Sequence, residues 1–403
     1  MIKLLLAASA LSITLVGYGQ SGKDFWGDLP AGKYQPAFKR YYTSNPTRTF
    51  VDSCRSATQI SARPEIINVW YPTTEKTGQR LTIKDLLTYN SGNKVYQGFD
   101  SALTANHHKN AMLYTYGDRN NEKATAPVNE WTSKTKSEFQ SYLSLITRSL
   151  IGKPIAKGRF PVIVYHQGLG GTPDDAFLLC EFFASHGFIV VNTAYQSNIC
   201  SRLNTSWNFD ITFNEIDFLV NFVDRQIPNA DISRLIGIGH SYGASAMLAY
   251  SSVSSTPFIA FLIFDSTADY EKTYTHSGFA QLKQRIYPRI QNITRPLFLV
   301  ARETATFRII DSLKNCDRYY LKVPAMSHED FTSQGAVAKY LQLKSYPDSA
   351  ELKIPYLNHL VQLQASLEFV NAILEKRPVN INKEVTDKNK IVFEMTPKGI
   401  SKY

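Results

Sequence analysis

The sequence predicts an α/β fold in which a mostly parallel sheet is covered by helices on both faces. From residue 160 onward, short and almost wholly apolar runs recur, as is typical of strands buried on both sides. Stretches with apolar residues at helical spacing lie between them, and this alternation indicates βαβ units and a parallel sheet. The 403 residues, of which 43% are hydrophobic, are enough for one large core plus an inserted subdomain.

The expected elements can be placed along the chain. An early strand is expected over residues 65–71, where Pro72 stops it. Later strands are expected at residues 161–165, 187–194, 235–239, 258–264, 296–301 and 319–323. Helices are expected at residues 173–185, 211–225, 244–250, 307–316 and 357–376. The charged tail, residues 383–403, is expected to be peripheral.

Residues 73–157 differ from the rest of the chain. They are polar and rich in Thr, Asn and Lys, with helix-like patches at residues 81–89 and 138–151. A connection of this length needs a structure or function of its own. We therefore expect an inserted helical subdomain within a single domain spanning residues 20–403. It could form a lid near the cleft or only decorate the surface.

The N-terminus has the pattern of a secretory signal peptide over residues 1–19. Lys3 precedes a short apolar run at residues 4–16, and the small residues Gly17 and Gly19 follow. The run is too short to span a membrane, and no later segment is long and apolar enough to do so. We expect cleavage near Gly19 and a secreted or periplasmic protein, with an uncleaved anchor as the alternative.

Charge and cysteine content exclude some classes of function. The formal net charge is +10, but the positive residues are scattered, which argues against nucleic-acid binding and allows at most weak association with anionic membranes. Export would permit disulfides, in one of three connectivities, and buried free thiols are the alternative. The spacing of the cysteines fits neither a zinc knuckle nor a redox CxxC motif, so they predict no metal site. The cysteines are Cys54, Cys180, Cys200 and Cys316.

Residues 239–243 form a G-x-S-x-G motif: Gly239, His240, Ser241, Tyr242 and Gly243. The motif lies between an expected strand and an expected helix, which is the setting of a nucleophile elbow. So tight a turn needs small residues two positions either side of the serine, and it lifts the serine oxygen to a helix N-terminus that favours negative charge. We expect Ser241 to be a nucleophile. A strand–helix turn that merely needs its glycines is the alternative.

A serine nucleophile needs a base, and in this type of fold the chain order is Ser, acid, His. His328 lies in the loop after the strand expected at residues 319–323, at the strand end where such sheets place their chemistry. His276 lies in a polar stretch and His359 within an expected helix, so both are expected to serve structure or solvent. His328 is therefore the expected base.

The acid that would orient this imidazole has more than one candidate. Asp265 follows the strand at residues 258–264, Glu303 follows the next strand, and Asp269 is a third candidate. Strand ends place both Asp265 and Glu303 at the correct rim of the sheet. The residue pattern leaves these two open.

An oxyanion hole is expected from two backbone N–H groups, one of them on Tyr242 after the nucleophile. The other is expected from the segment HQGLGG at residues 166–171, which follows the strand at residues 161–165. Its glycines would let the backbone approach a substrate closely. A dinucleotide cradle would need a glycine where Pro173 stands, and an ordinary flexible turn is the other alternative.

Several runs together resemble the platelet-activating-factor acetylhydrolase family and the related dienelactone-hydrolase-like esterases of the α/β-hydrolase superfamily. The resemblance covers about residues 45–72 and 158–375. The runs are INVWYP, YHQGLGG, ASHGFIVVNTAYQ, GHSYGAS, FLIFDS, RPLFLVARE and MSHEDF. Gln167, where relatives usually carry His, and Ala244, where many carry Gly, depart from the family pattern without removing a catalytic part.

The resemblance implies Asp265 rather than Glu303 as the acid, His328 as the base, and the N–H groups of Leu169 and Tyr242 as the oxyanion hole. It implies two-step acyl transfer through Ser241, without cofactor, on short-acyl or phospholipid-type esters. A peptidase or a polysaccharide-ester esterase of the same fold remains an alternative. A catalytically silent binding protein is another.

Overall fold

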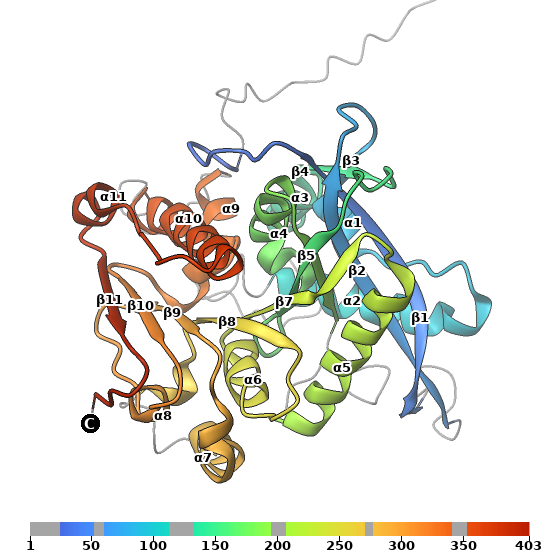
Figure 1. Cartoon of the computed structure of the whole chain (residues 1–403). Helices are drawn as coiled ribbons and strands as arrows, with labels where there is room; N and C mark the ends of the chain where they lie inside the picture. Colours follow the sequence, from blue (N-terminus) through green and yellow to red (C-terminus); the bar gives the residue numbers. More distant parts are fainter. Residues whose placement is uncertain are drawn as a thin grey trace, which may run out of the picture.

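The computed structural model describes residues 25–51, 60–112, 133–194, 207–270, 277–340 and 353–402. Within them an eleven-stranded sheet has the order β11-β10-β9-β8-β7-β5-β6-β2-β1-β4-β3 (Figure 1). Its central six strands are parallel. They are β10 (Arg318–Val323), β9 (Leu297–Arg302), β8 (Phe258–Phe264), β7 (Ala230–His240), β5 (Phe160–His166) and β6 (Ile189–Thr193). The predicted mostly parallel sheet is confirmed. The signal peptide expected at residues 1–19 lies outside the described residues.

The strands outside this parallel centre are mostly antiparallel to their neighbours. On one side β2 (Ile60–Thr73) pairs with β6 and β1 (Gln35–Val51), so β1 and β2 form a long hairpin. Beyond it lie β4 (Ile146–Ile151), which runs parallel to β1, and β3 (Arg80–Thr82). At the opposite edge β11 (Val392–Thr396) pairs with β10. β1 was not among the strands expected from the sequence.

Helices cover both faces of the sheet (Figure 1). Alternate residues of β5 enter two separate cores: Ile163 and Tyr165 pack on one face, and Val162 and Val164 on the other. The first face carries α4 (Phe177–Ser185) and α10 (Lys353–Glu375). The second carries α5 (Phe209–Gln226), α6 (Tyr242–Tyr250) and α7 (Ser277–Ile286). This two-sided burial explains why the strands are nearly continuous apolar runs.

The helix expected at residues 307–316 is much shorter than predicted. Only α8 (Ile309–Ser312) is helical there. The guanidinium of Arg318, at the start of β10, donates to the carbonyl oxygens of Ile310 and Asp311 at 3.0 Å each. These carbonyls at the end of α8 are thereby satisfied without a further helical turn, and the chain turns into the sheet.

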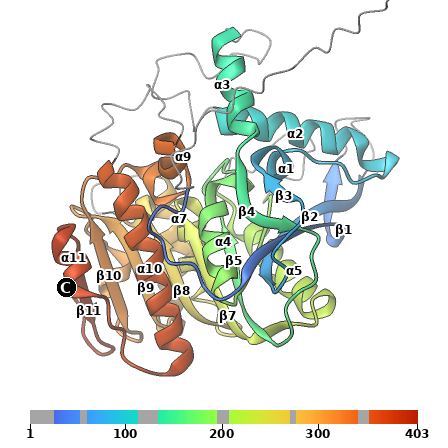
Figure 2. The same ribbon diagram turned by 90° about the horizontal axis from the view of Figure 1, so that it is seen from above.

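The insertion at residues 73–157 is not wholly helical. It holds α1 (Ile83–Leu87), the 3-10 helix η1 (Lys94–Tyr96), α2 (Gln97–Met112) and α3 (Ser133–Leu143), which gather at one side of the molecule (Figure 2). The helical patch expected at residues 138–151 is wrong in its second half, where β4 forms. Leu150 of β4 pairs with Ala37 of β1 and Arg80 of β3, so the insertion adds two strands to the main sheet.

The charged tail also joins the sheet, contrary to the expectation that it is peripheral. After α11 (Lys383–Lys388), β11 pairs with β10 in a register that sets Phe393 opposite Leu321. Arg318 donates to the carbonyl oxygen of Ile400. The tail therefore covers the edge of β10, which would otherwise expose unpaired backbone groups.

The two cysteines that the structure describes are free thiols, as the alternative to disulfides predicted. Cys180 on α4 and Cys316 before β10 are buried free thiols in different cores, on opposite faces of the sheet. Pairing of all four cysteines therefore does not occur. Cys54 and Cys200 lie outside the described residues.

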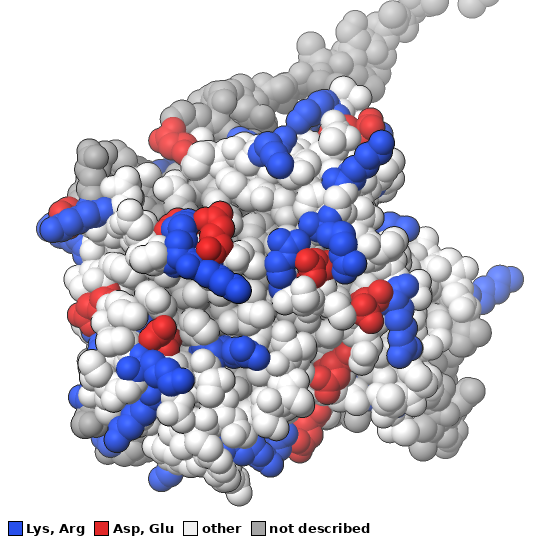
Figure 3. All heavy atoms as spheres, viewed as in Figure 1, with Lys and Arg blue, Asp and Glu red and all other residues white. Residues whose placement is uncertain are grey.

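Surface charge and helix length bear on the expected partners. On the face shown in Figure 3, Lys and Arg side chains are spread out, several of them beside Asp or Glu. Among the described helices, none combines the length and the apolar character that a membrane crossing requires.

Candidate active site

Three of the residues singled out in the sequence meet at the carboxyl ends of parallel strands. Ser241 follows β7, Asp265 follows β8, and His328 begins the 3-10 helix η8 (His328–Phe331) after β10. The Ser241 Oγ atom lies 2.8 Å from His328 Nε2, and His328 Nδ1 lies 2.5 Å from Asp265 Oδ2. An ionised carboxylate only accepts, so Nδ1 carries a proton, and Nε2 accepts from the serine hydroxyl when the imidazole is neutral.

The backbone at Ser241 has the strained conformation of a nucleophile elbow, with φ +57° and ψ −117°. A Cβ atom on Gly239 would lie 2.2 Å from the carbonyl oxygen of Gly243, and one on Gly243 would lie 2.0 Å from that of His166. Both positions therefore exclude any side chain. The two glycines let the turn close and let α6 approach the end of β5.

Asp265 is buried, with φ +44°. Burial raises the pKa of its carboxyl, but the hydrogen bond and charge of His328 outweigh burial, with smaller help from Tyr270 and Arg302, so the net pKa lies below its ordinary value. Glu303, the other candidate left open by the residue pattern, is exposed on the loop after β9. Asp265 is the carboxylate that contacts His328.

The third acid candidate, Asp269, has a structural position. It is buried and accepts the backbone N–H groups of Ile309 and Ile310 at 2.7 and 3.0 Å. These are the first residues of α8, so Asp269 satisfies donors that the helix leaves free. Of the other downstream histidines, His359 is buried within α10, and His276 lies outside the described residues.

The loop after β5 lies directly against Ser241. A Cβ atom on Gly168 would lie 3.2 Å from Ser241 Cβ and 3.6 Å from Ser241 Oγ. Leu169 follows in this loop, and the Gly171 N–H closes a turn onto the Gly168 carbonyl oxygen at 3.0 Å. Tyr242 begins α6, where backbone N–H groups have no partner within the helix and the dipole favours an anion.

Sequence reasoning missed the anchor of this loop, which is the buried carboxylate of Asp175. It accepts from the Thr172 backbone N–H at 3.0 Å and from Gln334 Nε2 at 3.3 Å, while the Asp175 carbonyl accepts from the Ser333 N–H at 2.6 Å. The loop beside Ser241 is thereby tied to the segment that follows His328. The local signal was the capping-box spacing of Thr172 and Asp175.

The Tyr242 side chain is held by α5. Its hydroxyl lies 3.0 Å from Thr212 Oγ1 and accepts the backbone N–H of Asn208 at 3.2 Å. Asn208 also caps α5, with its side-chain oxygen accepting the Ile211 N–H at 3.1 Å. The first turns of α5 therefore fix the residue next to Ser241.

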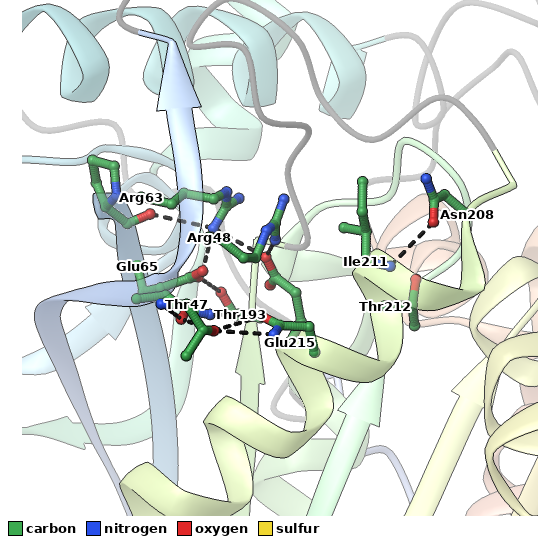
Figure 4. Close-up of polar contacts among 12 residues, drawn as sticks. Thr47, Arg48, Arg63, Glu65, Thr193, Asn208, Ile211, Thr212 and Glu215 are labelled. Atoms are coloured by element: carbon green, nitrogen blue, oxygen red, sulfur yellow. Dashed lines mark hydrogen bonds and ion pairs between the residues drawn. The ribbon is translucent and has the colours of Figure 1, made fainter. Parts of the chain in front are cut away.

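One turn further along α5, a buried ion cluster joins this helix to the β1–β2 hairpin (Figure 4). Arg63 Nη1 lies 3.1 Å from Glu215 Oε1 and 2.5 Å from Glu65 Oε1, and Arg48 also pairs with Glu215. Burial, and then the charge of Arg63, lower the pKa of Arg48 to about 9. The two positive and two negative charges balance, as burial of charge requires.

No metal site is evident in the part of the chain that the structure describes, where no group of three His, Cys, Asp or Glu could hold an ion. The arrangement around Ser241 instead combines a hydroxyl, an imidazole and a buried carboxylate in one hydrogen-bonded series. This is the geometry of nucleophilic acyl transfer.

Two comparisons relate the chain to known proteins. The chain resembles the structure of a ferulic acid esterase from Streptomyces cinnamoneus, with a TM-score of 0.59 and 12% identity over 90% of this chain and 97% of that chain. The protein has the α/β-hydrolase fold. A family model described as Chlorophyllase matches residues 120–275, a stretch that contains Ser241 and Asp265 but ends before His328.

No curated protein matches the chain in sequence. The family model covers less than half of the chain, and the structural likeness shows the fold. They do not confirm the narrower resemblance to platelet-activating-factor acetylhydrolases.

Proposed function

We propose that the protein is a serine hydrolase that cleaves carboxylic esters through an acyl-enzyme on Ser241. The observation that carries the proposal is the series of hydrogen bonds from Ser241 Oγ to His328 Nε2, and from His328 Nδ1 to Asp265 Oδ2. The three residues follow three different strands, and the two ring nitrogens of His328 lie 2.8 Å from the serine oxygen and 2.5 Å from the carboxylate oxygen.

In the proposed reaction, His328 Nε2 takes the hydroxyl proton of Ser241 as Oγ attacks the ester carbonyl carbon. Asp265 holds the imidazole in the required tautomer and stabilises its charged form. The N–H groups of Leu169 and Tyr242 stabilise the oxyanion, and His328 then protonates the leaving alcohol. A water activated by His328 hydrolyses the acyl-enzyme and releases the acid.

Two likenesses bear on the acyl group of the substrate. The sequence resemblance favours short-acyl or phospholipid-type esters, whereas the likeness to a ferulic acid esterase favours an aromatic acyl group, as in polysaccharide esters. Export through residues 1–19 forms part of the proposal and would place such substrates outside the cytoplasm.

Hydrolysis of p-nitrophenyl esters from acetate to octanoate, with methyl ferulate and an anilide beside them, tests the proposal. We expect wild type to hydrolyse esters, and Ser241→Ala to lose both hydrolysis and labelling by a fluorophosphonate. Equal activity in both proteins would contradict Ser241 as nucleophile. A folded wild type that neither hydrolyses nor labels would favour a binding protein, and preference for the anilide would favour a peptidase.

A further inference from the structure

The carboxylate of Asp265 has a second oxygen that His328 does not use. Oδ1 accepts from the hydroxyl of Tyr270 and lies 3.4 Å from Arg302 Nε. The Arg302 guanidinium also lies over the Tyr270 ring, 5.3 Å from its centroid. Tyr270 and Arg302 therefore form a packed unit behind the carboxylate, on the side away from the imidazole.

We propose that Tyr270 and Arg302 are positioning residues for the reaction: Tyr270 orients the Asp265 carboxylate, and the charge of Arg302 beside Oδ1 helps to keep His328 available as a base at lower pH. The inference rests on the proposed serine hydrolase function. It adds a second pair of residues to the acid side of the site and gives each a separate effect.

The argument for Tyr270 is geometric. A carboxylate on a single residue after β8 could rotate about its side-chain bonds, but a donor at Oδ1 leaves Oδ2 directed at His328. Tyr270 is itself held by a β-bridge to Phe307, with the two rings edge to face and their centroids 5.5 Å apart. Burial first, and then Asp265, raise the pKa of the Tyr270 phenol, so it remains a donor at any ordinary pH.

The argument for Arg302 is electrostatic. It ends β9, the strand next to β8, and its side chain is 39% exposed while that of Asp265 is fully buried. A positive charge there favours the ionised form of Asp265 and disfavours protonation of His328. Both effects keep the pair in the state needed for base catalysis, a neutral imidazole beside an ionised carboxylate.

Charged and titratable groups face His328 from each neighbouring element. Burial lowers the pKa of His328, Asp265 after β8 and Glu329 from the same short helix raise it, and Arg302 at the end of β9 lowers it. The imidazole of His240 from β7 lies tilted against the ring, but burial and the charge of His328 lower its own pKa to about 3, so it is neutral in the working range. Among the described residues, Arg302 is therefore the cation that opposes the two carboxylates.

The test is the second-order rate of Ser241 labelling by a fluorophosphonate from pH 5 to 9. The acidic limb of this profile is the range in which labelling slows as His328 becomes protonated. For Arg302→Gln we expect this limb to move to higher pH, with labelling about two- to fivefold slower at pH 6 and near wild type at pH 9. Arg302→Lys, which keeps the charge, should restore the limb. Tyr270→Phe should slow labelling about tenfold at every pH without moving the limb.

Arg295→Gln is the matched control, since it removes an exposed arginine just before the opposite end of β9 and should leave the profile unchanged. In wild type, 1 M salt should move the limb in the same direction as Arg302→Gln, because salt screens the half-exposed guanidinium more than the buried carboxylate. This measurement needs no variant to fold.

An Arg302→Gln profile that matches wild type after scaling, or a limb that salt does not move, would overturn the role of Arg302. Wild-type rates in Tyr270→Phe would overturn that of Tyr270. Failure of the proposed function has a different signature, because wild type itself would then remain unlabelled at every pH.

Discussion

The imidazole of His240 lies against that of His328, with ring centroids 4.7 Å apart, and His240 Nε2 is 3.0 Å from the carbonyl oxygen of His328. A carbonyl oxygen only accepts, so Nε2 carries the proton and donates. The residue before the nucleophile thus supports both the ring and the backbone of the proposed base. Its role in the motif goes beyond filling a position in the turn.

Replacing His240 should therefore slow the reaction without weakening substrate binding. His240→Ala removes the donor and the ring contact, and we expect kcat to fall about tenfold with little change in KM. His240→Gln, which can still donate, should recover part of the loss. A raised KM with unchanged kcat would instead place His240 in substrate binding.

The choice of acid can be tested by neutralising each candidate. Asp265→Asn should lower kcat by about 10³- to 10⁴-fold, because the amide favours the wrong tautomer of His328. Glu303→Gln removes an exposed charge on the next loop and should change kcat less than about twofold. The steady-state kcat values of the two variants decide which carboxylate is the acid. A severe loss of kcat in Glu303→Gln alone would assign that role to Glu303.

The pH dependence of kcat/KM should show an acidic limb with its midpoint above 6.5. Burial lowers the pKa of His328, but the hydrogen bond and charge of Asp265 raise it by more, so the net pKa lies above the ordinary value of 6.5. Activity needs the neutral imidazole, so it is present at higher pH and is lost as pH falls through this pKa. The check is a kcat/KM profile measured from pH 5 to 9. A midpoint of the acidic limb below 6.5 would contradict a raised pKa for His328.

Two alanine substitutions should separate folding from catalysis. Gly243→Ala places a methyl group 2.0 Å from a backbone oxygen, so the backbone must move and we expect a loss of about 3 kcal/mol or failure to fold. Gly168→Ala meets Ser241 Cβ at 3.2 Å, which needs only a small shift. Gly168→Ala should melt near the wild-type temperature yet hydrolyse esters more slowly. A stable Gly243→Ala together with an unfolded Gly168→Ala would contradict these contacts.

Asp269 should make stability depend on pH near neutrality. Burial raises its pKa to about 7, although hydrogen bonds from Ile309 and Ile310 oppose this. A raised folded-state pKa means that the contribution to stability is fully present below the unfolded value of about 4 and is lost as pH rises through about 7.

The melting temperature of wild type relative to Asp269→Asn should therefore fall between pH 4 and pH 8. Asp224→Asn, at an exposed carboxylate on α5, is the control and should show no such trend. A difference between wild type and Asp269→Asn that stays constant with pH would show that Asp269 does not titrate in this range.

Much of the parallel sheet could be predicted because the signal is local. Strands buried on both faces must be apolar at every position, so runs such as Phe258–Phe264 stand out without knowledge of their neighbours. Ser241 stood out as the proposed nucleophile for a similar reason, since the glycines around it are required by contacts within a single turn and its nearest strand. Chain order then indicated His328.

Elements whose state depends on distant partners could not be predicted in this way. Residues 146–151 carry a pattern that suits a helix or a strand, and pairing with β1, more than one hundred residues earlier, decides for a strand. β11 likewise forms because β10 presents an open edge. The anchor at Asp175 depends on Gln334, which is remote in sequence.

The sequence alone determined the α/β architecture, the elbow at Ser241 and the candidate base, because each follows from short-range periodicity, turn geometry or order along the chain. Only the tertiary structure showed which of Asp265 and Glu303 contacts His328. Both stand at strand ends on the same rim, and hydrogen bonding to His328 selects the one whose strand neighbours β7. The tertiary structure also brought Tyr270 and Arg302 behind that acid, a contact between the segment after β8 and the end of β9 that no local pattern encodes.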